Sequence, residues 1–324
     1  MLQYTLLSFL IGISAVSSEN ALRFTALGDW GGIPIFPYTS PFQIAVADTM
    51  GKVANALGSE FTIALGDNFY ETGVKDVNDR RFKDTFENVF TAPSLQKPWY
   101  VCAGNHDHKG NITAQLAYTK VSQRWNFPEL YYSKRFQIPN SGSSLLLVLI
   151  DTVILSGNTD DSTPGNELTD VDQEHADSQL KWIEDTLKTS NDDYIIVGGH
   201  YPVWSISEHG PNSRMVSQIR PLLEKYDVTA YFCGHDHNLQ HLKENNSSVN
   251  YFVIGAGDVV DPSTKHKDDV PPGSLKYHWA NILGLGGFGY VEATPQNMTL
   301  TLYQAINGKD IYKTVLKPRK KGLV

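Results

Sequence analysis

Cysteine is scarce in this sequence, which contains only Cys102 and Cys233 among its 324 residues. Two cysteines cannot build the disulfide framework that stabilises many small secreted domains. Each of them ends an apolar run just before a polar loop, and a free cysteine packs as a small hydrophobic side chain. We therefore expect two buried free thiols and a fold that depends on its hydrophobic core.

A surplus of positive charge is also missing. The 27 Lys and Arg residues are outnumbered by 35 Asp and Glu residues, which gives a formal net charge of −8 at pH 7. Domains that bind nucleic acid usually carry a basic surface, so this balance argues against nucleic acid as a partner. An anionic substrate would have to be attracted by positive charge inside the site itself.

No apolar run is long enough to cross a membrane, which takes about 20 residues. The run from Met1 to Ser18 ends in small residues and predicts a secretory signal peptide (residues 1–18) with cleavage near Ser17 or Ser18. An ordinary N-terminal strand or helix is the alternative. Residues 19–324 would then form a single catalytic domain. Export would also allow glycosylation at four sequons, Asn111, Asn245, Asn246 and Asn297.

Internal repeats, heptads and low-complexity tracts are absent as well. Apolar runs typical of buried strands alternate with amphipathic patterns typical of helices, which predicts an α/β fold of two packed sheets with helices outside. Strands are expected at residues 22–27, 61–65, 99–103, 144–150, 194–197 and 228–233, with a β-rich region at 249–314. Helices are expected at residues 41–57, 79–90, 177–187 and 214–226. In the first helix, Ile44, Met50, Val53 and Leu57 should face inward.

Side chains that bind metals follow several of these strands directly. They are Asp29 after the first strand, Asp67 and Tyr70 after the second, Asn105 after the third, and then His200, His235 and His237. Because the carboxyl ends of neighbouring strands in an open α/β sheet meet at one crevice, we expect these side chains to converge. Two carboxylates, a phenol, an amide and three imidazoles could hold two metal ions, so the sequence predicts a dinuclear metallohydrolase site.

Each of these residues also has an ordinary structural explanation. Asp29 or Asp67 could cap a helix or form a turn, Tyr70 could belong to the core, and His200 could be a buried, hydrogen-bonded histidine. The joint occurrence of all seven residues at successive strand ends outweighs these separate explanations.

Two substitutions in the loops carry a family resemblance. Most metallophosphoesterases have Asp-x-His in the first loop and a second Asp three residues after the bridging one, whereas this chain has Gly31 and Tyr70 at those positions. The segment that begins at His200 and ends at Pro211 also resembles the corresponding family segment. From Arg23 to about Lys313, the chain resembles the low-molecular-weight purple acid phosphatases of the tartrate-resistant type.

The resemblance implies a four-layer α-β-β-α sandwich of two mixed sheets flanked by helices. It also implies that Asp29, Tyr70 and His237 hold Fe(III), that Asn105, His200 and His235 hold Fe(II), zinc or manganese, and that Asp67 bridges the two ions. His106 and His209 would contact phosphate and protonate the leaving group. Their alternatives are a supporting hydrogen bond for His106 and a surface loop for His209, and we rank His108 as supporting.

A long acidic loop from Ser156 to Glu174 breaks the periodic pattern, and loops of this length are usually functional or disordered. It has the position of the family's repression loop, whose proteolysis relieves inhibition, so an activating protease is a candidate partner. The mammalian members have a disulfide where this chain has Ser156 and Arg214, so the loop is expected to lack that tether.

The function that we expect from these observations is a secreted or lysosomal acid phosphatase, acting as a monomer on phosphate monoesters through metal-hydroxide attack. A secreted metallophosphodiesterase would use the same metals but needs a groove for its second ester group. A non-enzymatic iron carrier would need the ligands but not His106 and His209.

Overall fold

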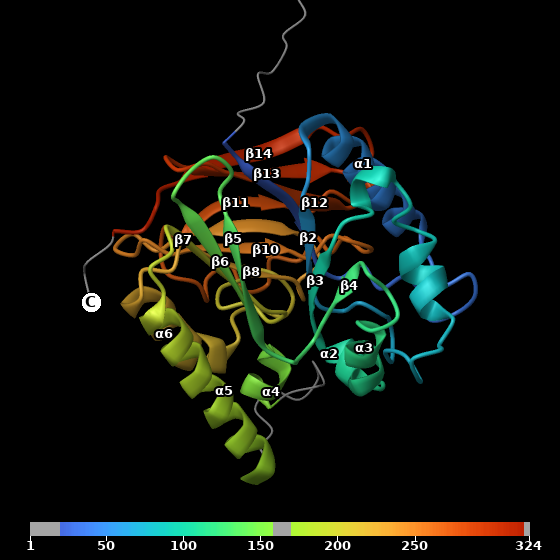
Figure 1. Ribbon diagram of the computed structural model, residues 1–324, viewed down its shortest axis with the longest axis horizontal. Helices are drawn as coiled ribbons and strands as arrows, with labels where there is room; N and C mark the ends of the chain where they lie inside the picture. The colour runs from blue at the N-terminus through green and yellow to red at the C-terminus, as the bar shows by residue number, and fades with distance from the viewer. Residues whose placement is uncertain (1–19, 158–169, 321–324) are drawn as a thin grey trace, which may run out of the picture.

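The computed structural model describes residues 20–157 and 170–320, in which the strands form two sheets of seven strands each (Figure 1). The first sheet has the strand order β14-β13-β12-β1-β2-β3-β4. Its strands are β1 (Leu22–Leu27), β2 (Phe61–Leu65), β3 (Trp99–Cys102), β4 (Trp125–Asn126), β12 (Gly287–Ala293), β13 (Met298–Gln304) and β14 (Asp310–Leu316). Strands β1 to β4 are parallel, whereas β12 to β14 are antiparallel to their neighbours.

The second sheet has the order β11-β9-β10-β8-β7-β6-β5. Its strands are β5 (Tyr132–Gln137), β6 (Ser144–Leu149), β7 (Tyr194–Gly198), β8 (Ala230–Cys233), β9 (Leu239–Leu242), β10 (Asn250–Ile254) and β11 (Leu275–Trp279). Strands β6, β7, β8 and β10 are parallel, and the remaining pairs are antiparallel, so both sheets are mixed.

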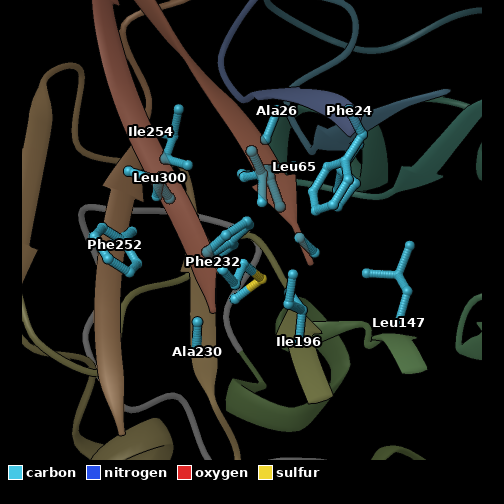
Figure 2. Packing of buried hydrophobic residues seen from close by; sticks show 14 of the residues in the cluster. Phe24, Ala26, Leu65, Leu147, Ile196, Ala230, Phe232, Phe252, Ile254 and Leu300 are labelled. Atoms are coloured by element: carbon cyan, nitrogen blue, oxygen red, sulfur yellow. The ribbon is translucent and has the colours of Figure 1, made fainter. Parts of the chain in front are cut away.

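The main core lies between the two sheets, as Figure 2 shows. Alternate residues of each strand point to this side, because successive side chains of a strand point to opposite faces. Phe24 of β1 and Leu65 of β2 belong to this core, together with Ile196 of β7, Phe232 of β8 and Ile254 of β10. Most of the intervening residues of the inner strands are buried too, as Leu27, Val148 and Val197 are, so both faces of each sheet are largely covered.

Helices cover the outer face of each sheet. Helix α1 (Pro41–Leu57) packs Val46 and Met50 against the outer side of the first sheet. Helices α5 (Asp170–Thr189) and α6 (Arg220–Lys225) pack Ile183 and Leu223 against the outer side of the second sheet. In Figure 1, α1 lies on one flank of the molecule and α5 with α6 on the other. The predicted four-layer α-β-β-α arrangement is confirmed.

Shorter helical segments lie in the connections between these layers. They are η1 (Phe82–Glu87), η2 (Pro93–Leu95), α2 (Asn105–His108), α3 (Ile112–Tyr118), α4 (Thr152–Ser156), η3 (Met215–Ile219) and η4 (Ile282–Gly284). Within the described ranges, no helix is both long enough and apolar enough to cross a membrane. Both cysteines are buried and free, as expected.

Some predicted helices differ from the structure. Helix α1 has the expected bounds, but Ile44 is 53% exposed and Leu57 is 36% exposed. Its buried face instead includes Ala47, Gly51 and Ala54, whose small side chains allow close packing. The helix expected at 79–90 is a shorter π-helical turn, η1, and the helix expected at 214–226 is divided into η3 and α6.

The acidic loop is shorter than predicted. Helix α4 includes Ser156 and helix α5 begins at Asp170, so both ends of the expected 156–174 loop are helical. Acidic residues are favourable in the first turns of a helix, where they complement its dipole, and this explains why the acid-rich end of the loop can be helical. Residues 158–169 of this loop, like the predicted signal peptide at 1–18, lie outside the described residues.

Candidate active site

Tight turns at the ends of three strands present candidate ligands. Asp29, Asp67 and His235 have positive φ angles of 58°, 50° and 71°. Such backbone conformations are uncommon for residues other than glycine and are concentrated at functional sites. Gly104 brings a fourth loop close, because a Cβ atom at that position would lie 2.2 Å from Asp67 Oδ1. The backbone of these turns thus brings loops from β1, β2, β3 and β8 together.

One group of candidate ligands surrounds the phenol of Tyr70. Its hydroxyl oxygen lies 3.2 Å from Asp29 Oδ1 and 3.0 Å from His237 Nε2. Asp29 Oδ1 and His237 Nε2 are themselves 3.5 Å apart. Asp29 is fully buried, whereas the His237 side chain is 25% exposed, so this group opens to solvent on the histidine side.

The second group is formed by Asp67, Asn105 and His200, which are all buried. His200 Nε2 lies 2.9 Å from Asn105 Oδ1 and 3.4 Å from Asp67 Oδ1. His200 Nδ1 is 2.9 Å from the carbonyl oxygen of Leu65. Since a carbonyl only accepts hydrogen bonds, Nδ1 carries a proton and Nε2 faces the two oxygens.

His235 joins the two groups. Its backbone N–H donates to Asp29 Oδ2 at 2.8 Å, and its ring lies 5.0 Å from the ring of His200, centroid to centroid. Donor atoms of Asp29, Asp67 and His200 lie within 4.8 Å of one another. The structure therefore brings all seven predicted ligands into one cluster.

The electrostatics of the cluster fit a bound cation. Histidines are the ion-pair partners of the buried Asp29 and Asp67 among the described residues. Burial opposes the charged imidazole of His200, but the charge and hydrogen bond of Asp67, with the Asp29 charge and the Leu65 carbonyl, together outweigh burial and raise the pKa of His200 to about 10. The Asp29 carboxylate similarly raises the pKa of His237 to about 9, against the effect of burial. The site attracts positive charge, which a proton or a metal ion can supply.

The pKa values of Tyr70 and His235 are also shifted in ways that suit a bound cation. Burial, followed by the charges of Asp29 and Asp67, raises the pKa of Tyr70 well above 10. Its phenol could therefore ionise below neutral pH only beside a strongly charged cation. Burial and the neighbouring histidines, His209 first, lower the pKa of His235 well below 6.5. His235 is thus held neutral, which is the form that binds metals.

The two predicted catalytic histidines lie at the edge of the cluster. The backbone N–H of His106 donates to Asp67 Oδ1 at 3.0 Å, and its Nδ1 lies 2.7 Å from the carbonyl oxygen of Glu71. This carbonyl leaves the Nε2 side of the ring directed at the cluster, 3.9 Å from Asp67 Oδ2. His209 is exposed, and its ring lies 4.2 Å from that of His235, centroid to centroid.

Asp107 is a supporting residue that the sequence reasoning missed. It is fully buried and accepts hydrogen bonds from Asn68 N, Gly104 N and Gln115 Nε2. Burial, followed by the charge of Asp67, raises its pKa to about 6. Asp107 thereby joins the two loops that carry Asp67 and Asn105. In the sequence, the position of Asp107 between His106 and His108 in the third loop could have indicated this role.

His108 turns away from the cluster, in agreement with its supporting rank. Its Nε2 lies 2.8 Å from Asp151 Oδ2, and Asp151 also accepts from the N–H groups of Val153 and Ile154 at the start of α4. This contact connects the third loop to the second sheet.

The four sequons are placed outside the cluster. Asn111 is exposed and caps helix α3, and Asn245 and Asn246 are exposed between β9 and β10. Asn297 is partly buried between β12 and β13. Glycosylation at these positions stays a prediction.

The chain matches one protein family along two thirds of its length. Residues 22–239 match the model of the calcineurin-like phosphoesterases. This range begins at β1 and ends after the loop that carries His235 and His237, so it contains every candidate ligand.

Individual relatives agree with this match. The tartrate-resistant acid phosphatase type 5 of Oryctolagus cuniculus is 50% identical over 309 residues, which are 95% of this chain and 94% of the relative. Purple acid phosphatase 17 of Arabidopsis thaliana is 29% identical, over 94% of this chain and 86% of the relative. The solved structure of GAP50, described as the anchor in the inner membrane complex of Plasmodium, has a TM-score of 0.80 at 23% identity, over 93% of this chain and 90% of that one. That likeness concerns the fold alone.

Proposed function

Because the chain belongs to the calcineurin-like phosphoesterase family and its relatives of about half identity are acid phosphatases, we propose that it hydrolyses phosphate monoesters at a dinuclear iron-containing centre. That it is a phosphatase follows from the family relationship. The choice of metals, the role of each residue and the location in the cell are the proposal. Purple acid phosphatase relatives imply a dinuclear centre, and the buried Asp29, Asp67 and His200 are suited to it.

The observation that carries the proposal is the position of the Tyr70 phenol. Its oxygen lies within 3.2 Å of Asp29 Oδ1 and 3.0 Å of His237 Nε2, although a buried tyrosine could have packed anywhere in the apolar core. Oxygen donors that can bind as anions suit a small ion of high charge, and a phenolate in particular suits ferric iron. The proposed Fe(III) ligands are therefore Asp29, Tyr70 and His237.

The neutral donors form the proposed divalent site. Asn105, His200 and His235 suit Fe(II), zinc or manganese, because amide oxygen and imidazole nitrogen carry no charge of their own. Asp67 Oδ1 lies 3.4 Å from His200 Nε2, and Asp67 shares the loop after β2 with Tyr70, so it is the proposed bridging ligand. Two bound ions would neutralise the phosphoryl oxygens and acidify water to give the hydroxide nucleophile.

The chain's own groups would then bind and orient the phosphate ester. His106 keeps its Nδ1 proton on the Glu71 carbonyl and presents Nε2 to the side of the cluster where phosphate would enter. His209 lies at the exposed edge beside His235, where its ring can reach the oxygen of the leaving group. A proton delivered from His209 or His106 would assist the departing alcohol, a contribution of about 10²–10⁴-fold in rate.

The proposed location is the secretory pathway, with the protein secreted or lysosomal. It rests on the predicted signal peptide at 1–18 and on the sequons, of which Asn111, Asn245 and Asn246 are exposed. N-terminal sequencing of the protein purified from culture medium tests this part. A first residue close to position 19 supports export, whereas an intact Met1 in protein found only inside the cell contradicts it.

A direct test of the activity combines metal analysis with two substrates. We expect the purified protein to contain two metal ions per chain, at least one of them iron, and to cleave 4-nitrophenyl phosphate much faster than bis(4-nitrophenyl) phosphate. His200→Ala should lose the divalent metal and most of the activity. His175→Ala, which removes an exposed histidine from α5, is the matched control and should retain both. Faster cleavage of the diester would favour a phosphodiesterase, and bound iron without cleavage of either ester would favour an iron carrier.

A further inference from the structure

The segment that carries His209 is anchored by a row of buried polar groups. In this segment, Trp204 and Ile206 pack into the hydrophobic core of the second sheet, and the side chains of Ser205 and Ser207 are fully buried. Residues 203–207 lie outside every strand of the described sheets. Something other than a sheet ladder must satisfy their polar groups.

The facing groups come from the residues that precede and begin β9. Asp236 and Asn238 precede β9 and Gln240 lies within it, and all three are buried. Asn238 Nδ2 donates to Ser207 Oγ at 2.6 Å, and the Ser205 hydroxyl donates to Asp236 Oδ2. The two short rows therefore pair side chain to side chain.

The side-chain amide of Gln240 makes hydrogen bonds that the backbone of a neighbouring strand would otherwise make. Its Oε1 accepts the N–H of Ile206 at 3.0 Å, as a neighbouring strand's carbonyl would. Its Nε2 donates to Ser205 Oγ at 2.8 Å and to Asn238 Oδ1 at 2.8 Å. A single amide thus contacts both rows, and its removal would leave several buried groups without partners.

The row ends at the proposed proton donor. Asp236 Oδ1 accepts the backbone N–H of His209 at 3.0 Å. Asp236 also stands between His235 and His237 in the sequence, so the same side chain connects the strand end bearing two candidate ligands to His209. The network thus holds the backbone at His209, whose ring lies 4.2 Å from the ring of His235, centroid to centroid.

A second contact holds the same segment from outside. Glu208, the neighbour of His209, accepts from Ser263 Oγ at 2.9 Å and from Lys265 Nζ at 3.0 Å. The backbone N–H of Asp261 donates to the carbonyl of His237 at 2.8 Å. The contacts of Glu208 are exposed and contribute little energy individually, so the buried polar groups are the stronger constraint on this segment.

We propose that Ser205, Ser207, Asp236, Asn238 and Gln240 are positioning residues that hold His209 over the metal cluster for protonation of the leaving group. This inference rests on the proposed function. Apolar side chains of the same size would fill the space with less desolvation, but they would allow the segment to slide, whereas a fully satisfied polar network favours one geometry.

The test compares two monoesters that differ in their need for a proton. Phenyl phosphate releases a basic phenoxide, whereas 4-nitrophenyl phosphate releases a stabilised anion that departs without help. Gln240→Leu keeps the volume and removes the amide, and we expect the ratio of kcat/KM for phenyl to nitrophenyl phosphate to fall about tenfold, a part of the general-acid contribution. Ser207→Ala, which is a smaller change, should lower the ratio about threefold.

Two further variants make the result specific. Asn250→Leu removes a buried amide at the start of β10, which is the strand end away from the cluster. There it contacts His241, Thr229 and Ser248, and its removal should leave the ratio unchanged. In a His209→Ala background, Gln240→Leu should have no additional effect on the ratio, because both changes remove the same proton transfer. Metal content should equal that of the wild type in every variant.

Three results would overturn the inference. They are an unchanged ratio in both Gln240→Leu and Ser207→Ala, an unchanged ratio in His209→Ala, and a ratio that falls equally with and without His209. If Gln240→Leu does not fold, Ser207→Ala decides the question alone. A wild type that cleaves neither ester would instead refute the proposed function, so the two failures can be distinguished.

Discussion

The phenol oxygen of Tyr70 lies 3.2 Å from Oδ1 of Asp29, although 41 residues separate the two in sequence. Asp29 lies in the loop after β1 and Tyr70 in the loop after β2, and parallel pairing of these strands brings the two loops to the same edge. The phenol donates a hydrogen bond to Asp29, but the charge of this buried carboxylate is costly unless a positive charge lies nearby. The contact is suited to the ferric half of the proposed metal centre.

Close approach of the loops makes Gly104 a sensitive position. In Gly104→Ala the new Cβ would lie 2.2 Å from Asp67 Oδ1 and 2.4 Å from Asp67 N, so the loop carrying the proposed bridging ligand must move. We expect loss of most bound metal and activity, with a destabilisation of about 2–4 kcal/mol. Metal analysis and urea unfolding measure both effects. Gly142→Ala, with nothing within 4 Å of its Cβ, is the control and should behave as wild type.

Stability should fall in acid because of a histidine outside the site. His241 is buried between Tyr312 and Asn250, and burial, opposed by its hydrogen bond to Asn250 and reinforced by the charges of Lys243 and Lys276, lowers its pKa to about 4. The unfolded chain takes up this proton near pH 6.5 but the folded chain does not, so stability present above that pH is lost progressively towards pH 4.

His241→Gln removes the titrating group while keeping hydrogen-bonding capacity. We expect the wild type to lose up to about 3 kcal/mol more than this variant between pH 7 and pH 4, as the pKa difference implies. Urea midpoints at several pH values provide the measurement. Parallel pH profiles for the two proteins would show that His241 does not contribute.

Glycosylation and helix capping can be separated at Asn111. Its Oδ1 accepts from Ala114 N at 3.0 Å at the start of α3, and its Nδ2 donates to the carbonyl of Lys75. Asn111→Ala should remove both sequon and cap and cost about 1 kcal/mol even in unglycosylated protein. Thr113→Val removes the sequon and an exposed hydrogen bond to Asn111 Oδ1 but keeps the cap, so it should cost less. Equal stability of the two variants in bacterially expressed protein would mean that the cap contributes nothing.

Much of the fold and of the site could be predicted because the sequence patterns that specify them are local. Apolar runs such as 22–27 and 61–65 begin and end at the residues that the structure shows for β1 and β2. Each is followed by Gly-Asp, and the rule that strand ends converge was sufficient to bring Asp29 and Asp67 together.

The features that were missed depend on distant partners. Asp107 could not be interpreted without Asn68, 39 residues away, and the Ser205–Asp236 pair spans 31 residues. The buried face of α1 was wrong at Ile44, because small residues such as Ala47 pack more closely on the sheet than the larger side chains that hydrophobicity favours. Side-chain burial of this kind is decided by tertiary packing, which the pattern of one helix does not contain.

The most direct test of the account is the visible spectrum of wild-type and Tyr70→Phe protein, with iron quantified in both. A phenolate bound to ferric iron gives a charge-transfer band, and Tyr70 is the one phenol in the seven-residue ligand set. The substitution removes a single hydroxyl, so the core should tolerate it. We predict a coloured wild type and a folded, colourless variant with a weaker preference for trivalent iron. A colourless wild type containing two irons, or a variant that retains the band, would contradict the assignment of Tyr70 and with it the ferric site.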